Sequence, residues 1–203
     1  MSQSSHVRFG HCSPDAPDFD VLIDGEIRFE GVEFETLSSY VELPAGTHEI
    51  RITPVGEETP VIVTNLRFDA DSAYSVLAMR PFAEIETMVL TDEPGTSSIA
   101  DSHVRFVHTV PDGPPVDVKL RDGETLFEEV PPYAATDYHD LDVGEFDIDV
   151  YPAGSDVAVL ELAEIELVSE RSYTVVATGT FEDTSLSALI STDWPADESL
   201  SGE

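Results

Sequence analysis

The sequence predicts an all-β protein made of two tandem immunoglobulin-like antiparallel β-sandwich domains. Three observations lead to this expectation: one sequence pattern occurs twice, apolar and polar residues alternate within short segments, and Gly, Pro and Asp separate those segments. Alternation with a period of two residues indicates a strand with one buried face. Seven or eight such strands at regular spacing are typical of a β-sandwich.

The duplicated pattern sets the domain organisation. The first copy reads His6-Val-Arg-Phe-Gly-His11, Ser13-Pro-Asp-Ala-Pro17 and Asp20-Val-Leu-Ile-Asp-Gly25. The second copy reads His103-Val-Arg-Phe-Val-His108, Val110-Pro-Asp-Gly-Pro114 and Asp117-Val-Lys-Leu-Arg-Asp-Gly123. We therefore expect a first sandwich over residues 1–93, a linker over 94–101, a second sandwich over 102–193 and a loose acidic tail over 194–203.

The strands are expected in the same order in both copies. The alternation that follows the opening strand begins at Asp20 and at Asp117, and the turns Asp24-Gly25 and Asp122-Gly123 are typical of hairpins. Later strands in the first copy are expected at 26–29, 39–43, 48–52, 60–66, 72–79 and 86–91. Their counterparts are expected at 124–127, 137–141, 146–150, 157–165, 171–178 and 186–192.

The composition is strongly acidic. The net charge is -33, from 42 acidic and 9 basic residues, and Lys119 is the only lysine. Such a charge destabilises a compact state by self-repulsion, but molar salt reduces the Debye length to about 3 Å and weakens that repulsion. The acids are spread along the strands and 41% of the residues are apolar, so a disordered acidic chain is disfavoured. We expect a halophilic protein that binds neither nucleic acid nor anionic membrane surfaces.

The repeated His and Asp residues are the candidate ligand or structural turn site. Imidazole and carboxylate groups this close in sequence could bind a metal or form an acid/base pair. A Ser-Pro-Asp turn that these side chains merely brace is the favoured alternative. The residues are His11, Asp15, Asp20, His108, Asp112 and Asp117.

No catalytic residue is expected. A nucleophile at Cys12 or Ser13 has no counterpart, because Thr109 and Val110 occupy these positions in the second copy. Calcium could bind the acidic loops 15–18 or 69–71, but they lack the full spacing of a calcium loop. No cofactor is therefore expected beyond a possible divalent cation. The single cysteine also rules out an intramolecular disulfide.

The segments His11-Cys-Ser-Pro-Asp-Ala-Pro17, Asp20-Val-Leu-Ile-Asp-Gly25, Leu43-Pro-Ala-Gly46 and Ala73-Tyr-Ser-Val-Leu-Ala78 carry a family resemblance. They resemble the domain-of-unknown-function 4397 family, which would here be a tandem pair of halophilic archaeal type. The second copy departs from the pattern at Val110, Gly113 and Asp142. The resemblance implies a sandwich module without an established activity, usually found in tandem in bacterial and archaeal surface or envelope proteins.

We therefore expect a non-catalytic binding or interaction module, possibly associated with the envelope, that binds a protein or glycan partner or self-associates. The alternative is a metal-binding protein or metal-dependent hydrolase that uses the repeated His/Asp sets. The N-terminus shows no signal peptide and no stretch could span a membrane, which favours the cytoplasm. The family resemblance favours the cell surface instead.

Overall fold

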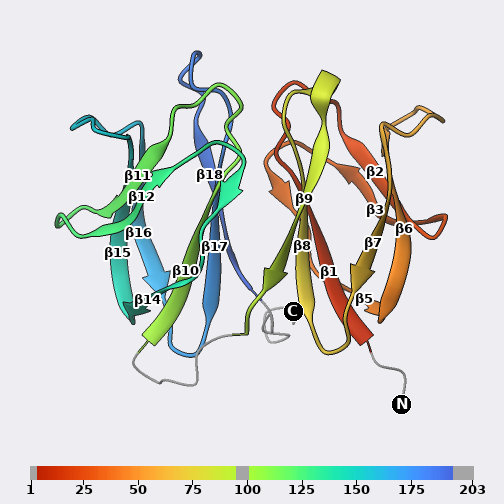
Figure 1. The fold of residues 1–203 in the computed structure, drawn as a ribbon, viewed down its shortest axis with the longest axis horizontal. Coiled ribbons are helices and arrows are strands. Elements are labelled where there is room, and N and C mark those ends of the chain that lie inside the picture. Colours follow the sequence, from red (N-terminus) through yellow and green to blue (C-terminus); the bar gives the residue numbers. More distant parts are fainter. Residues whose placement is uncertain (1–3, 95–100, 194–203) are drawn as a thin grey trace, which may run out of the picture.

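The structure is a computed structural model that describes residues 4–94 and 101–193. The expected tail over 194–203 and most of the expected linker over 94–101 lie outside these ranges. Figure 1 shows two all-β halves side by side, one from each sequence repeat. Within the described residues, no helix is long and apolar enough to cross a membrane.

Repeat one forms two sheets. The first has the order β4-β1-β8-β9, with β5 also paired to β1, and the second has the order β3-β2-β6-β7. The strands are β1 (Ser4–His11), β2 (Phe19–Ile23), β3 (Glu26–Val32), β4 (Thr36–Leu37), β5 (Val41–Pro44), β6 (Gly46–Pro54), β7 (Ile62–Phe68), β8 (Ala73–Met79) and β9 (Glu86–Asp92). A single 3-10 turn, η1 (Phe82–Glu84), precedes β9.

Repeat two has the same strand order, β13-β10-β17-β18 with β14 on β10, and β12-β11-β15-β16. Its strands are β10 (Asp101–His108), β11 (Val116–Leu120), β12 (Thr125–Val130), β13 (Ala134–Ala135), β14 (His139–Asp142), β15 (Gly144–Pro152), β16 (Leu160–Leu167), β17 (Ser172–Thr178) and β18 (Ser187–Thr192). The prediction of an all-β chain with two sandwich-like halves is confirmed, and the strand arrangement is consistent with an immunoglobulin-like outline. The pairings are antiparallel except for β1 with β8 and β10 with β17, which are parallel.

Each sandwich encloses its own apolar core. Phe19, Val21 and Ile23 of β2 point inward while Asp20 and Leu22 are only half-buried, as the alternation predicts. Val116, Val118 and Leu120 occupy the equivalent inward positions of β11.

The central strands β8 and β17 lack this alternation, because every residue in each strand is buried. One face of β8 packs on the core of repeat one, and the other face packs against repeat two. An interdomain cluster of buried residues joins the halves; it consists of Cys12, Leu77, Met79, Val107 and Val176. The two sandwiches are therefore joined by this third apolar cluster, which is smaller than the core of either sandwich.

Candidate functional site

The repeated histidines hold turns at the ends of β1 and β10. His11 Nε2 donates to the carbonyl of Pro17 at 3.0 Å, and His11 Nδ1 accepts from the Ser13 amide at 3.3 Å. His108 makes the same two contacts, with the Pro114 carbonyl and the Val110 amide. One donating and one accepting nitrogen correspond to a neutral ring in the Nε2–H tautomer.

Burial supports that neutral form. His11 has no exposed surface and His108 is 2% exposed. Burial lowers the pKa of both histidines, although the Pro17 and Pro114 carbonyls raise it in part. With both ring nitrogens engaged by the main chain, neither imidazole is presented as a free base.

The repeated aspartates also accept main-chain hydrogen bonds. Asp15 accepts from the Phe82 amide at 2.8 Å, and its counterpart Asp112 accepts from the Phe181 and Glu182 amides at 2.7 and 2.9 Å. These contacts attach the turn after the first strand of each repeat to the loop before its last strand.

The second aspartate of each repeat braces the returning strand of the hairpin. Asp20 accepts from the Gly31 amide at 2.8 Å, and Asp117 accepts from the Glu129 amide at 2.9 Å. His11 and Asp15 therefore have different main-chain partners, and so do His108 and Asp112. Among residues 4–94 and 101–193, no three His, Cys, Asp or Glu side chains are grouped so that they could hold a metal ion.

Cys12 and Ser13, which the comparison of the two copies disfavours as nucleophiles, are both buried. Cys12 has no exposed surface, and burial raises the pKa of its thiol to about 12. The Ser13 hydroxyl is also fully buried and donates to the Arg80 carbonyl at 2.6 Å. Neither group is presented to a substrate as an activated nucleophile.

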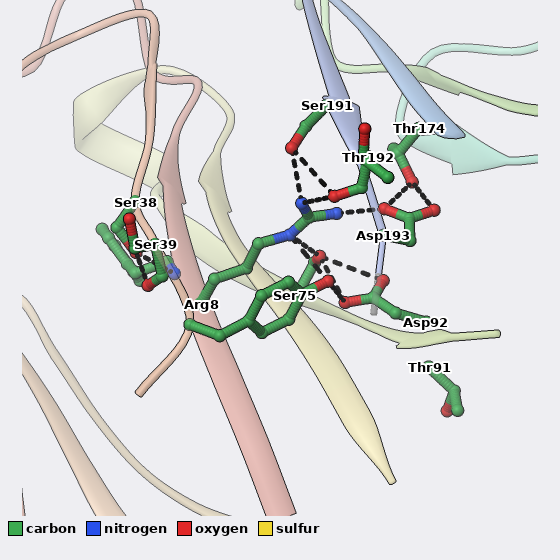
Figure 2. A network of polar contacts seen from close by, with 12 residues as sticks. Arg8, Ser38, Ser39, Ser75, Thr91, Asp92, Thr174, Ser191, Thr192 and Asp193 are labelled. Atoms are coloured by element: carbon green, nitrogen blue, oxygen red, sulfur yellow. Dashed lines mark hydrogen bonds and ion pairs between the residues drawn. The ribbon is translucent and has the colours of Figure 1, made fainter. Parts of the chain in front are cut away.

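A buried polar network joins the two repeats and was not anticipated from the sequence. Figure 2 shows Arg8 of β1 reaching across to the end of β18. Its Nη1 donates to Ser191 Oγ at 2.7 Å and to the Thr192 carbonyl at 3.1 Å, and its Nη2 pairs with the Asp193 carboxylate. Arg8 Nε remains within its own repeat and donates to Ser75 Oγ at 2.7 Å.

Repeat two makes the equivalent contacts to repeat one. Arg105 of β10 bonds the Thr91 carbonyl at 2.8 Å and pairs with the Asp92 carboxylate, both in repeat one. Its Nε donates to Thr174 Oγ1 at 2.8 Å within repeat two. Each half therefore supplies one buried cation and one buried anion to the other half, as in a two-fold symmetric dimer interface.

Two tyrosines complete the network. Tyr40 donates to Asp92 at 2.7 Å, and its ring lies 4.7 Å from the Arg8 guanidinium carbon. Tyr138 donates to Asp193 at 2.7 Å and lies 4.8 Å from Arg105. Burial, together with the neighbouring carboxylates, raises the pKa of both phenols. The network joins side chains of each repeat to the end of the last strand of the other, so it holds the two repeats against each other.

A second polar group lies on the opposite side of repeat two, on the outward face of β11, β15 and β16. Arg121 follows β11 and donates to both carboxylate oxygens of Asp149, at 3.2 and 2.7 Å. It also contacts Asp147, and these carboxylates raise the pKa of Arg121. Lys119 Nζ lies 5.3 Å from the centre of the Tyr151 ring on the same face. We call this set, with Glu161, the outer face of repeat two.

A hollow of about 340 Å³ adjoins this face where β11 ends and β15 begins. Its lining residues are Leu120, Arg121, Asp122, Glu145, Phe146 and Asp147. Repeat one differs at the equivalent place, because Asp24 occupies the position of Arg121 and His48 occupies the position of Phe146. There, His48 bonds Asp24 at 2.6 Å and the Pro44 carbonyl at 2.8 Å, which attaches the hairpin turn to β6.

A protein-family model matches both repeats of the chain. The model of the family described as "Domain of unknown function (DUF4397)" matches residues 5–119 and 102–203. The chain belongs to the DUF4397 family. No curated protein matches it. Among solved structures, it is similar over 93% of its length to 96% of the chain in "Crystal structure of CBMbc (family CBM26) from Eubacterium rectale Amy13K in Complex with Maltoheptaose". That likeness has 8% identity and a TM-score of 0.27, which is too low to support an argument.

The repeated motif of this DUF4397 chain thus contains two kinds of residue. His11, Asp15 and Asp20 were recognised as a set, and each contacts the main chain of its own repeat. Arg8 and Arg105 lie in the same motif but were not singled out. The signal that could have identified them is a cation between apolar residues at identical positions of both copies, since a buried charge requires a partner.

Proposed function

We propose that this DUF4397 protein is a non-catalytic binding module with a protein or glycan partner. The observation that supports this most is that the repeated polar side chains already have hydrogen-bond or ion-pair partners within the protein. The six predicted site residues accept or donate main-chain hydrogen bonds, and the buried Arg and Asp residues pair between repeats. A module that binds without transforming its ligand needs none of these groups for chemistry.

The same packing leaves particular surfaces for a partner. In each repeat the central strand β8 or β17 is buried on both faces. The sheet that does not contain this strand buries one face and leaves its outward face to solvent, where residues such as Val63 and Arg121 lie. We infer that binding uses an outward sheet face or a loop end.

We also propose that the module works in concentrated salt. The net charge of -33 produces repulsion that salt screens, whereas the buried pairs between the repeats are screened much less. Raising potassium chloride from low to molar concentration should increase the unfolding temperature. A decrease would contradict the salt adaptation.

The binding function is tested by affinity capture in molar potassium chloride, with the immobilised full chain as bait. The same preparation is applied to an array of glycans and analysed by light scattering for self-association. We expect one reproducible protein, glycan or self-partner that the heat-denatured chain does not retain. A chain that binds no protein and no glycan and stays monomeric would refute the proposal.

A further inference from the structure

We propose that the outer face of repeat two, together with the adjoining hollow, binds a neutral oligosaccharide. This inference rests on the proposed binding function and specifies its surface and ligand class. It comes from a difference between the repeats. The turn-holding His and Asp residues and the interdomain pairs occur in both copies, so the fold accounts for them; the Lys119, Arg121 and Tyr151 set occurs in only one.

The hollow is an open depression of about 340 Å³ on the surface. Its shape fits a ligand that lies along the surface and remains partly exposed to solvent. Half-buried Phe146 contributes apolar surface, whereas Leu120 is almost fully buried, and charged side chains from the hairpin turn and from the start of β15 surround them. In repeat one, the His48–Asp24 hydrogen bond joins these same two segments, and Phe146 cannot make that bond.

The polar surface continues from the hollow along the sheet. Arg121 borders the hollow and also binds Asp149, whose carboxylate lies 3.4 Å from the Tyr151 hydroxyl. Lys119 pairs with Asp149 in the β11–β15 ladder, and Asp117 pairs with Tyr151. Arg121, Lys119 and the Tyr151 ring therefore lie near one another on this face, while Asp149 is 4% exposed and binds Arg121.

The charges on this surface favour a neutral ligand. Carboxylates outnumber the two cations on the outer face and around the hollow. An anionic ligand would therefore meet like charges at a contact distance of about 3 Å, which is no longer than the Debye length in molar salt. Arg121 neutralises Asp147 and Asp149 locally, which reduces the attraction for a cationic ligand. Hydroxyl groups both donate and accept, so a sugar can bond ammonium, guanidinium and carboxylate groups alike.

The sheet geometry disfavours an added peptide strand. β11 and β15 are the two central strands of their sheet, and each is paired on both sides. Their main-chain groups are thus used within the ladder, whereas a peptide that adds to a sheet requires an open edge. This surface offers only side chains, which suits a ligand recognised through its hydroxyl groups and the apolar faces of its rings.

The test is isothermal titration of the full chain in molar potassium chloride with a panel of neutral hexasaccharides that differ in sugar and linkage, and with a Lys-rich peptide for comparison. Tyr151→Ala and Glu145→Gln alter the aromatic ring and the rim of the hollow while preserving the Arg121–Asp149 pair. Thr53→Ala and Thr47→Ala change the equivalent positions of repeat one and are the matched controls. Thermal unfolding of each variant verifies that it folds.

We expect at least one neutral hexasaccharide to bind, at least tenfold weaker binding in each repeat-two variant, and wild-type binding in both controls. A sugar that binds all variants equally would overturn the assignment of this face and leave the binding function intact. Binding of a Lys-rich peptide but no sugar would overturn the ligand class while leaving the binding function intact. A chain that binds no sugar, peptide or other partner would overturn both proposals.

Discussion

Replacing Arg8 by methionine would test how strongly the two repeats depend on each other. Arg8 is 1% exposed and its Nη2 pairs with Asp193, which is also 1% exposed. Methionine retains much of the apolar stem but makes none of these bonds. In the variant Asp193 keeps hydrogen bonds from Thr174 and Tyr138, but its charge has lost its partner in repeat one.

The expected loss of free energy of unfolding follows from that unpaired charge. Removing one member of a buried ion pair typically costs about 3–5 kcal/mol, a large part of the roughly 5–15 kcal/mol that stabilises a domain. Arg8→Met and Asp193→Asn should each lower the free energy of unfolding by about this amount. The double variant should lose much less than the sum, because residues that share a network are coupled by about 0.5–3 kcal/mol.

Chemical denaturation followed by circular dichroism at constant salt would measure these free energies. Arg51→Met is the matched control, because Arg51 pairs with Glu49 at 2.7 Å but its side chain is 46% exposed; we expect little change there. Labelling of Cys12 by a thiol reagent supplies a second measurement, since the cysteine is buried in the interdomain cluster. Additive single effects with unchanged labelling would refute the reasoning.

Three further predictions concern single sites. Burial lowers the folded-state pKa of His11 and His108, so the unfolded chain binds more protons than the folded chain below about pH 6.5. The free energy of unfolding should therefore decrease as the pH falls in that range, by at most about 1.4 kcal/mol per pH unit for each histidine. Denaturation from about pH 8 to about pH 5 measures this; a flat profile would show that the rings titrate alike in both states, and increasing stability would show that they are charged in the fold. Val116 borders a cavity of about 20 Å³, and the larger Phe19 occupies the equivalent position of repeat one. Val116→Ile should therefore raise the free energy of unfolding by about 0.5–1 kcal/mol, as measured by denaturation. A lower free energy of unfolding would show that the cavity cannot accept a methyl group. The thiol of Cys12, with its pKa raised to about 12, should react with a disulfide reagent only at the rate of opening or unfolding, and fast labelling of native protein at neutral pH would contradict this.

The fold was largely predictable because local alternation matches the final environment of most strands. The expected strand at 48–52 lies within β6, where His48, Ile50 and Ile52 are buried and Arg51 is exposed. The expected hairpin from Asp20 corresponds to β2 and β3. The short strands β4 and β13 were missed because two residues carry no periodicity.

The relation between the repeats was not predictable from local patterns. β8 has an apolar sequence on both faces, which fits a strand buried on two sides but does not identify the second partner. Parallel pairing of β1 with β8 likewise joins segments far apart in sequence. The positions of His11 and Asp15 were predicted as turn or ligand residues, and only their bonding partners distinguish the two roles.

Arg8 and Asp193 are 185 residues apart in sequence, and this separation has a consequence for biosynthesis. Domains generally fold in order as the ribosome releases them, N-terminal first. When the first sandwich emerges, Arg8 has only the more distant carboxylate of Asp92, at 3.9 Å, because its partner Asp193 has not yet been translated. The first sandwich reaches full stability only when the end of the second sandwich is complete. A prematurely terminated chain that lacks Asp193 would keep this defect and be exposed to proteolysis.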